Sequence, residues 1–123
     1  MKYIIDKEKR PVYLQIIEKI QDTVLSGELS PGSKLPPVRE LAASARVNPN
    51  TMQHALQELE RQQLLNAVST SGRFITNDET IIQTTKQKRL QELTEICVKS
   101  FEALGVSPAQ AAEYLRKYQE RKD

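Results

Sequence analysis

The stretch VNPNTMQHALQELERQQLL (residues 47–65) joins a short polar run that contains a proline to a strongly periodic segment. Asn48 is suited to cap a helix and Pro49 to be its first residue, so the start of this helix is clearly signalled. Residues at three- and four-residue steps predict one mostly apolar face, formed by Met52, Ala55, Leu56, Leu59 and Gln63. Where a solvated helix usually presents Lys and Glu, the exposed first turn carries other polar residues: Asn50, Thr51, Gln53 and His54.

Two further helices are predicted before this stretch and a hairpin after it. Apolar spacing indicates a helix over residues 11–26 and a shorter one over residues 37–45. The second and third helices form a helix-turn-helix over about residues 38–57, in which the capping Asn and the Pro after it are expected to replace the usual turn glycine. The period then changes to two, and Ser-Thr-Ser-Gly is predicted to close a hairpin over about residues 65–76. The predicted fold is mainly α with a small β-hairpin, a winged helix-turn-helix.

The polar first turn of the third helix has the chemistry of a surface that binds DNA. Asn, Gln and His side chains donate to and accept from base edges in the major groove, and Thr contacts either base or phosphate. The first acidic residue of this helix is Glu58, two turns from its start, so carboxylates are kept away from that end. The helix N-terminus also offers free N–H groups and a positive dipole end to a phosphate. Double-stranded DNA is therefore the favoured partner, and a plain polar helix cap is the alternative.

Basic residues flank this surface. Arg39 is predicted on the outer face of the second helix, where it would bind a phosphate or a guanine. Lys34 and Arg46 would add contacts to the DNA backbone, which set the register of the protein without reading the base sequence. The alternative for Arg39 is an ion pair with Glu40 or Glu58.

Residues 11–76 resemble the DNA-binding domain of the GntR family of bacterial transcription regulators. The matching pieces occur in order along the chain: Gly27, Leu29, Pro31-Gly32, Leu35-Pro36, Arg39-Glu40-Leu41-Ala42, Val47-Asn48-Pro49-Asn50-Thr51, Ala55-Leu56, Leu59-Glu60, Gly72 and Phe74-Ile75. The resemblance implies a winged helix-turn-helix that binds operator DNA as a homodimer. It implies a recognition surface formed by Arg39, Asn48, Asn50, Thr51 and Gln53.

The predicted wing departs from the family pattern. Arg73 follows Gly72 and is predicted at the wing tip, where its guanidinium group would enter a minor groove. The family wing commonly carries two glycines around a basic residue, whereas Thr70 stands at the first glycine position here. Pro37 stands where the family often has a Ser that touches phosphate. Gln63 stands where the family frequently has a Gly after the third helix, the one that recognises DNA.

The last part of the chain is predicted to be a pair of helices that serves dimerisation. The predicted domains are residues 1–77, which bind DNA, and residues 78–123, a tail too short for the ligand-binding or aminotransferase-like domains of larger family members. Such a tail resembles the YtrA-like branch of the family. Two helices alone cannot cover the tail's apolar positions: Leu90, Leu93, Cys97, Phe101, Leu104, Leu115 and Tyr118. Because burying a Leu or Phe side chain contributes about 1.5–3 kcal/mol, a symmetric partner is predicted.

Composition excludes several other classes of function. The 123 residues carry 28% charged side chains and a net charge of +2, with no run of the roughly 18 apolar residues that a membrane span needs. The first eleven residues lack a secretory signal. A single Cys and a single His predict neither a disulfide framework nor a metal site, and suit the cytoplasm. The chain has no catalytic constellation and no phosphate-binding loop, so neither enzymatic activity nor a cofactor is predicted.

The sequence thus predicts a sequence-specific DNA-binding transcription regulator, foremost a repressor that binds a palindromic operator as a homodimer. Control of transporter genes is implied by the resemblance alone. The alternative function is a winged-helix module for protein–protein interaction. The operator, the regulated genes and a small-molecule effector are left open by the sequence.

Overall fold

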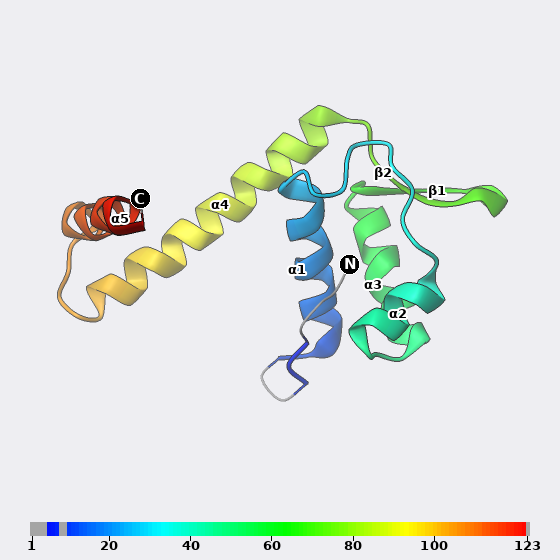
Figure 1. Cartoon of the computed structure of the whole chain (residues 1–123), viewed down its shortest axis with the longest axis horizontal. Helices are drawn as coiled ribbons and strands as arrows, with labels where there is room; N and C mark the ends of the chain where they lie inside the picture. Colours follow the sequence, from blue (N-terminus) through cyan, green and yellow to red (C-terminus); the bar gives the residue numbers. More distant parts are fainter. Residues whose placement is uncertain (1–4, 8–9, 123) are drawn as a thin grey trace. The chain divides into compact units, whose positions relative to one another are not determined.

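The computed structural model describes residues 5–7 and 10–122, so residues 1–4 of the predicted DNA-binding domain, and residues 8–9 and 123, lie outside the described part (Figure 1). The architecture is the predicted one, mainly helical with one two-stranded hairpin. The elements in chain order are α1 (Val12–Leu25), α2 (Val38–Ala45), α3 (Pro49–Arg61), β1 (Leu65–Val68), the short 3-10 turn η1 (Ser69–Ser71), β2 (Gly72–Ile75), α4 (Glu79–Glu102) and α5 (Pro108–Lys122).

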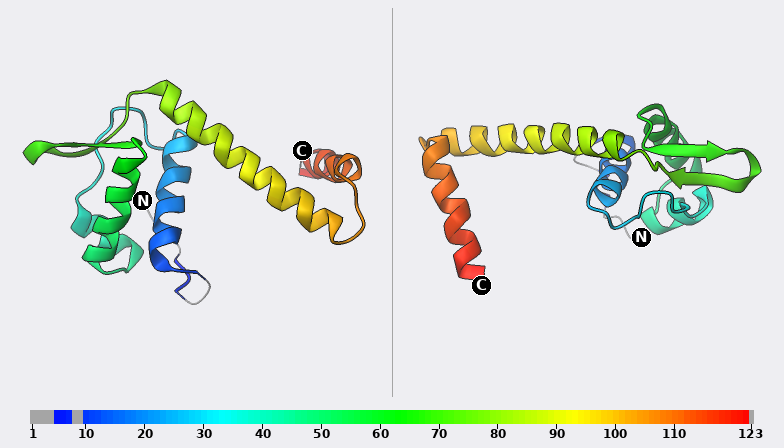
Figure 2. Two further views of the ribbon diagram at one scale, coloured as in Figure 1. Left: turned by 180° about the vertical axis from the view of Figure 1, so that it is seen from behind. Right: turned by 90° about the horizontal axis from the view of Figure 1, so that it is seen from above.

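The chain forms two compact units, one reaching Thr85 and the other starting at Lys86, and α4 contributes to both. In the first unit α1 and α3 lie side by side and α2 packs against α3 (Figure 2). The predicted face of α3 is confirmed for its four apolar residues, which are buried in the core of this unit, whereas Gln63 is exposed and lies beyond the end of the helix. The side chains that fill this core from the three helices include Ile16, Ile20, Leu41, Met52, Leu56 and Leu59.

The turn between α2 and α3 contains a residue in the left-handed conformation. Arg46 has a φ of +57° and ends α2, although such a conformation costs a residue with a side chain roughly 1–2 kcal/mol. The expectation that Asn48 and Pro49 serve in place of the turn glycine holds for the cap, but the glycine-like conformation itself is taken by Arg46, which the sequence did not indicate. The predicted start of α3 is confirmed: Pro49 is its first residue, and Asn48 Oδ1 accepts a hydrogen bond from the Asn50 N–H at 2.7 Å.

The hairpin of β1 and β2 receives a third segment that the sequence did not indicate. The two strands are antiparallel, and Val68 pairs with Gly72 next to the closing turn. Lys34 forms a bridge to the outer side of β2, and the neighbouring Leu35 N–H donates to the Arg73 carbonyl oxygen at 2.8 Å. The segment before α2 therefore runs along the wing, and Lys34 becomes part of it.

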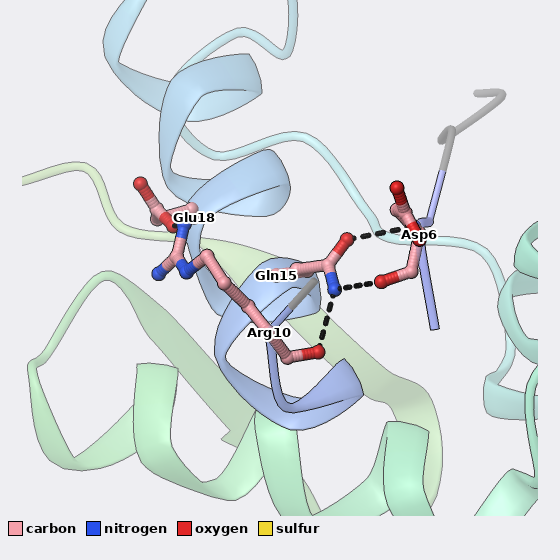
Figure 3. A network of polar contacts seen from close by, with 4 residues as sticks. All are labelled: Asp6, Arg10, Gln15 and Glu18. Carbon is pink, nitrogen blue, oxygen red and sulfur yellow. Dashed lines mark hydrogen bonds and ion pairs between the residues drawn. The ribbon is translucent and has the colours of Figure 1, made fainter. Parts of the chain in front are cut away.

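The residues before α1 are tied to that helix by Gln15, which is 8% exposed. The Gln15 side chain accepts the Asp6 N–H at 2.8 Å and donates to the carbonyl oxygens of Asp6, at 2.6 Å, and Arg10, at 2.8 Å (Figure 3). An ion pair between Arg10 and Glu18 lies beside these hydrogen bonds. Since one buried amide satisfies three backbone groups, the described part of the N-terminal segment is well anchored to α1.

The second unit has clearly marked helix ends and almost no core. Gly105, with a φ of +75°, follows α4, as the sequence predicts. The Ser107 N–H donates to Gln110 Oε1 at 2.9 Å, and the Gln110 N–H donates to Ser107 Oγ at 3.3 Å, which is a capping box. Ala111 is the one buried residue among those described from Lys86 onward. Within the described part of the chain, no helix has the length and apolar character needed to cross a membrane.

Candidate nucleic-acid interface

The first two turns of α3 present the predicted polar side chains together. Asn50 and His54 are exposed, whereas Thr51 and Gln53 are half-buried. Asn50, Thr51 and His54 line an open hollow of about 390 Å³ whose other wall is Tyr13 of α1. Tyr13 carries no sequence signal for this surface, because its place beside α3 depends on how α1 packs. The hollow offers amide, hydroxyl, imidazole and phenol groups, which suit base edges and phosphates.

Asn48 contributes to this surface chiefly through the helix end that it caps. Its side-chain oxygen accepts the Asn50 N–H, so the acceptor is used inside the protein. The two N–H groups of its amide have no partner among the described residues. They therefore remain available to a phosphate oxygen at the positive end of the helix dipole.

The guanidinium groups of the two arginines in the helix-turn-helix form no ion pair within the described part of the chain. Arg39 is exposed on α2 and forms no ion pair with any residue that the structure describes. The alternative pairing of Arg39 with Glu58 is not found, because Glu58 pairs with Arg61 within α3. Arg46 is likewise exposed and unpaired within the described part of the chain. Both arginines can therefore offer charge to a ligand without first breaking a contact inside the protein.

Lys34 supplies a basic group beside the end of the wing. It is exposed, and it lies so close to Gly72 that a methyl group added there would come within 3.2 Å of Lys34 Cε. Gly72 has a φ of +100°, a conformation that side-chain-bearing residues rarely adopt, so glycine suits this position for two reasons. The predicted site residues Lys34 and Gly72 are thus brought together.

The predicted position of Arg73 at the wing tip is wrong. Arg73 is the second residue of β2 and pairs with Ala67 across the hairpin, while the tip is formed by η1. The Arg73 side chain, 16% exposed, turns back to α3, where Nε forms an ion pair with Glu60 and Nη1 donates to Gln53 Oε1 at 3.3 Å. A carboxylate within reach explains this direction, because a charge-assisted hydrogen bond is about twice as strong as a neutral one.

The second unit exposes an apolar surface. Seven of the nine large apolar side chains that are exposed in the described chain belong to it, and we call them the tail surface: Leu90, Leu93, Ile96, Leu104, Tyr114, Leu115 and Tyr118. The other predicted dimerisation residues, Cys97 and Phe101, are half-buried, and the Phe101 ring lies 6.0 Å from that of Tyr114. Ile96 and Tyr114 were not predicted as dimerisation residues, although Ile96 lies three residues after Leu93 and Tyr114 lies four residues before Tyr118.

Comparison with known proteins identifies the family. Residues 12–75, more than half of the chain, match the model of the bacterial regulatory proteins of the gntR family. The chain is 35% identical to the uncharacterized HTH-type transcriptional regulator YhcF of Bacillus subtilis, over 93% of the chain and 94% of that relative. It is 32% identical to the HTH-type transcriptional repressor YtrA of Bacillus subtilis, over 89% of the chain and 85% of that relative.

Solved structures agree with this assignment. A GntR family transcriptional regulator from Listeria monocytogenes has a TM-score of 0.83 to this chain at 31% identity, over 89% of this chain and 96% of that one. The DNA-binding domain of AraR in complex with operator ORE1 has a TM-score of 0.54 at 28% identity, over 62% of this chain and 93% of that one. The matches to YhcF and YtrA extend well beyond the wing. The chain therefore belongs to the GntR family, in its YtrA-like branch, and is a DNA-binding transcription regulator rather than an enzyme.

Proposed function

We propose that the protein binds a palindromic operator as a homodimer and represses transcription by occluding a promoter. The observation that carries this proposal is the start of α3, where Asn50, Thr51, Gln53 and His54 lie in the first two turns of the helix with no acidic residue among them. Side chains of this kind recognise base edges when a helix enters the major groove.

The electrostatics of α3 also favour a polyanion. The helix holds two acidic residues, and each is paired: Glu58 with Arg61 and Glu60 with Arg73. No uncompensated carboxylate on the described helix would therefore repel a phosphate. Lys34, Arg39 and Arg46 add three basic groups without a competing ion pair in the described part of the protein.

The relatives support the same function. YtrA is named a transcriptional repressor, and the DNA-binding domain of AraR is solved on an operator. We transfer both properties to this chain, repression from YtrA and operator binding from AraR. The resemblance to the YtrA-like branch further supports transporter genes as targets and the cytoplasm as the location.

The tail surface supports homodimerisation. Its side chains are between 44% and 81% exposed in the single chain, and its own unit has one buried residue among those described. Each large apolar side chain that a partner covers contributes up to about 1.5–3 kcal/mol, so a second copy that covers the same surface in return is the economical solution. A two-fold dimer places two α3 helices on half-sites about 10–10.5 bp apart, or a multiple of that spacing.

Selection of the purified protein against a pool of random DNA duplexes tests the proposal. We expect a palindromic consensus whose binding constant falls steeply as salt rises, because bound phosphates release counterions. If no sequence is enriched and binding is weak at every salt concentration, the polar face of α3 meets a protein instead, which is the alternative function. A consensus without two-fold symmetry would contradict binding as a homodimer.

A further inference from the structure

We propose that Arg73 is a positioning residue, which holds the Gln53 amide as a hydrogen-bond donor and thereby makes Gln53 favour bases whose major-groove edge presents acceptors without a donor. The inference rests on the proposed function, because it takes α3 to be the helix that meets DNA. It assigns Arg73 a role inside the protein in place of the minor-groove contact that its position in the sequence indicates.

The geometry joins the wing to the recognition helix. Gln53 and Glu60 are seven residues apart, so they lie two turns apart on one face of α3. Arg73 reaches both from β2, with Nε on the Glu60 carboxylate and Nη1 donating to Gln53 Oε1 at 3.3 Å. The side chains of Arg73 and Glu60 are only 16% and 27% exposed, so solvent screens this ion pair less than it would screen a pair at the surface.

The chemistry of the guanidinium group determines the orientation of the Gln53 amide. Arginine has five N–H donors and no acceptor, so the atom of Gln53 that faces Arg73 must be the oxygen. The nitrogen Nε2, with its two N–H groups, is then the end that is left for a ligand. Glu60 accepts from Nε and so keeps the guanidinium in place while Nη1 donates to Gln53.

This orientation favours particular bases. A glutamine that recognises adenine uses both ends of its amide, donating to N7 and accepting from the N6 amino group. With Oε1 engaged by Arg73, Gln53 keeps its donors and loses most of its accepting capacity. Guanine presents two acceptors in the major groove, N7 and O6, and thymine presents O4. Gln53 is therefore directed to guanine or thymine and away from adenine.

Selection with matched variants tests this preference. The base contacted by Gln53 is identified as the operator position whose preference disappears in Gln53→Ala. At that position we expect guanine or thymine with the native protein, and a shift of about 5- to 150-fold towards adenine with Arg73→Met. Glu60→Gln, which keeps the shape and weakens the ion pair, should shift the preference in the same direction. Adenine at this position with the native protein, or an unchanged preference in both variants, would overturn the inference.

The salt dependence of binding separates positioning from a direct phosphate contact. A plot of the logarithm of the binding constant against that of the salt concentration should have the same slope for Arg73→Met and the native protein. Lys34→Met is the matched control, and its slope should be smaller by about 0.9, the value for one lost phosphate contact. A similar decrease for Arg73→Met would overturn the inference, because Arg73 would then contact DNA itself. If the native protein enriches no sequence, the proposed function fails and this inference fails with it.

Discussion

The side-chain oxygen of Asn48 accepts the backbone N–H of Asn50 at 2.7 Å, and this hydrogen bond caps the N-terminus of α3. Asn48→Ala removes the acceptor, so we expect the free energy of unfolding to fall by about 1 kcal/mol in urea denaturation. Asn48→Asp keeps an oxygen there and adds a charge that the helix dipole favours, so stability should be retained. The same charge would repel phosphates and weaken operator binding. An Asp variant that binds as tightly as the native protein would contradict the placement of Asn48 beside DNA.

A second prediction concerns Gln63, which follows the C-cap residue of α3 and has a φ of +66°. This conformation costs a residue with a side chain roughly 1–2 kcal/mol, whereas introducing glycine costs about 0.5–1 kcal/mol in chain entropy. Gln63→Gly should therefore raise the free energy of unfolding by up to about 1 kcal/mol. Gln57→Gly, in the interior of α3, is the control and should lower it by about 1 kcal/mol. Destabilisation by Gln63→Gly would show that its side chain contributes more than the conformation costs.

The core of the first unit should be sensitive to the loss of a single side chain. Leu59 is fully buried, and Leu59→Ala is expected to lower the free energy of unfolding by about 2–5 kcal/mol through lost contacts and a cavity. Leu14, on α1, is 43% exposed, and Leu14→Ala should change the free energy of unfolding by no more than about 0.5 kcal/mol. Denaturant titration of both variants measures the difference. Equal effects would mean that the packing of α1 on α3 is not the source of stability.

Dimerisation can be tested with two leucines of nearly equal exposure. Leu93 on the tail surface is 46% exposed, and Leu14 in the first unit is 43% exposed. Leu93→Glu places a charge where the second copy is expected to lie, so sedimentation velocity should show a monomer at concentrations where the native protein is a dimer. Leu14→Glu should remain a dimer. If both variants keep the native mass, the tail surface does not form the dimer.

The sequence predicted the features whose causes are local. The cap formed by Asn48, the first helical residue Pro49, and the capping box of Ser107 and Gln110 each depend on atoms within a few residues of one another. Apolar spacing likewise identified the buried face of α3, because one helix face must contact the core. These features follow from the backbone geometry of a single element and need no knowledge of the fold.

The features that the sequence did not show depend on contacts between distant segments. Lys34 joins the wing because the segment before α2 pairs with β2, some forty residues later. Arg73 contacts Glu60 and Gln53 because β2 returns beside α3, so its side chain turns away from the tip. The left-handed conformation of Arg46 carries no sequence signal, since arginine does not favour it. The residue types in the sequence therefore indicated the candidate DNA-binding residues. The structure was needed to separate those whose side chains are open to a ligand from those whose side chains bind other parts of the protein.

The most direct test of the central claim is a titration of the selected operator duplex with the native protein, Asn50→Ala and Gln91→Ala. Asn50 is exposed in the first turn of α3, whereas Gln91 is an exposed amide on α4. We expect Asn50→Ala to weaken binding by about 5- to 150-fold, the loss associated with one specific base contact, and Gln91→Ala to bind as the native protein does. If Asn50→Ala binds the operator as tightly as the native protein, the first turn of α3 does not recognise DNA.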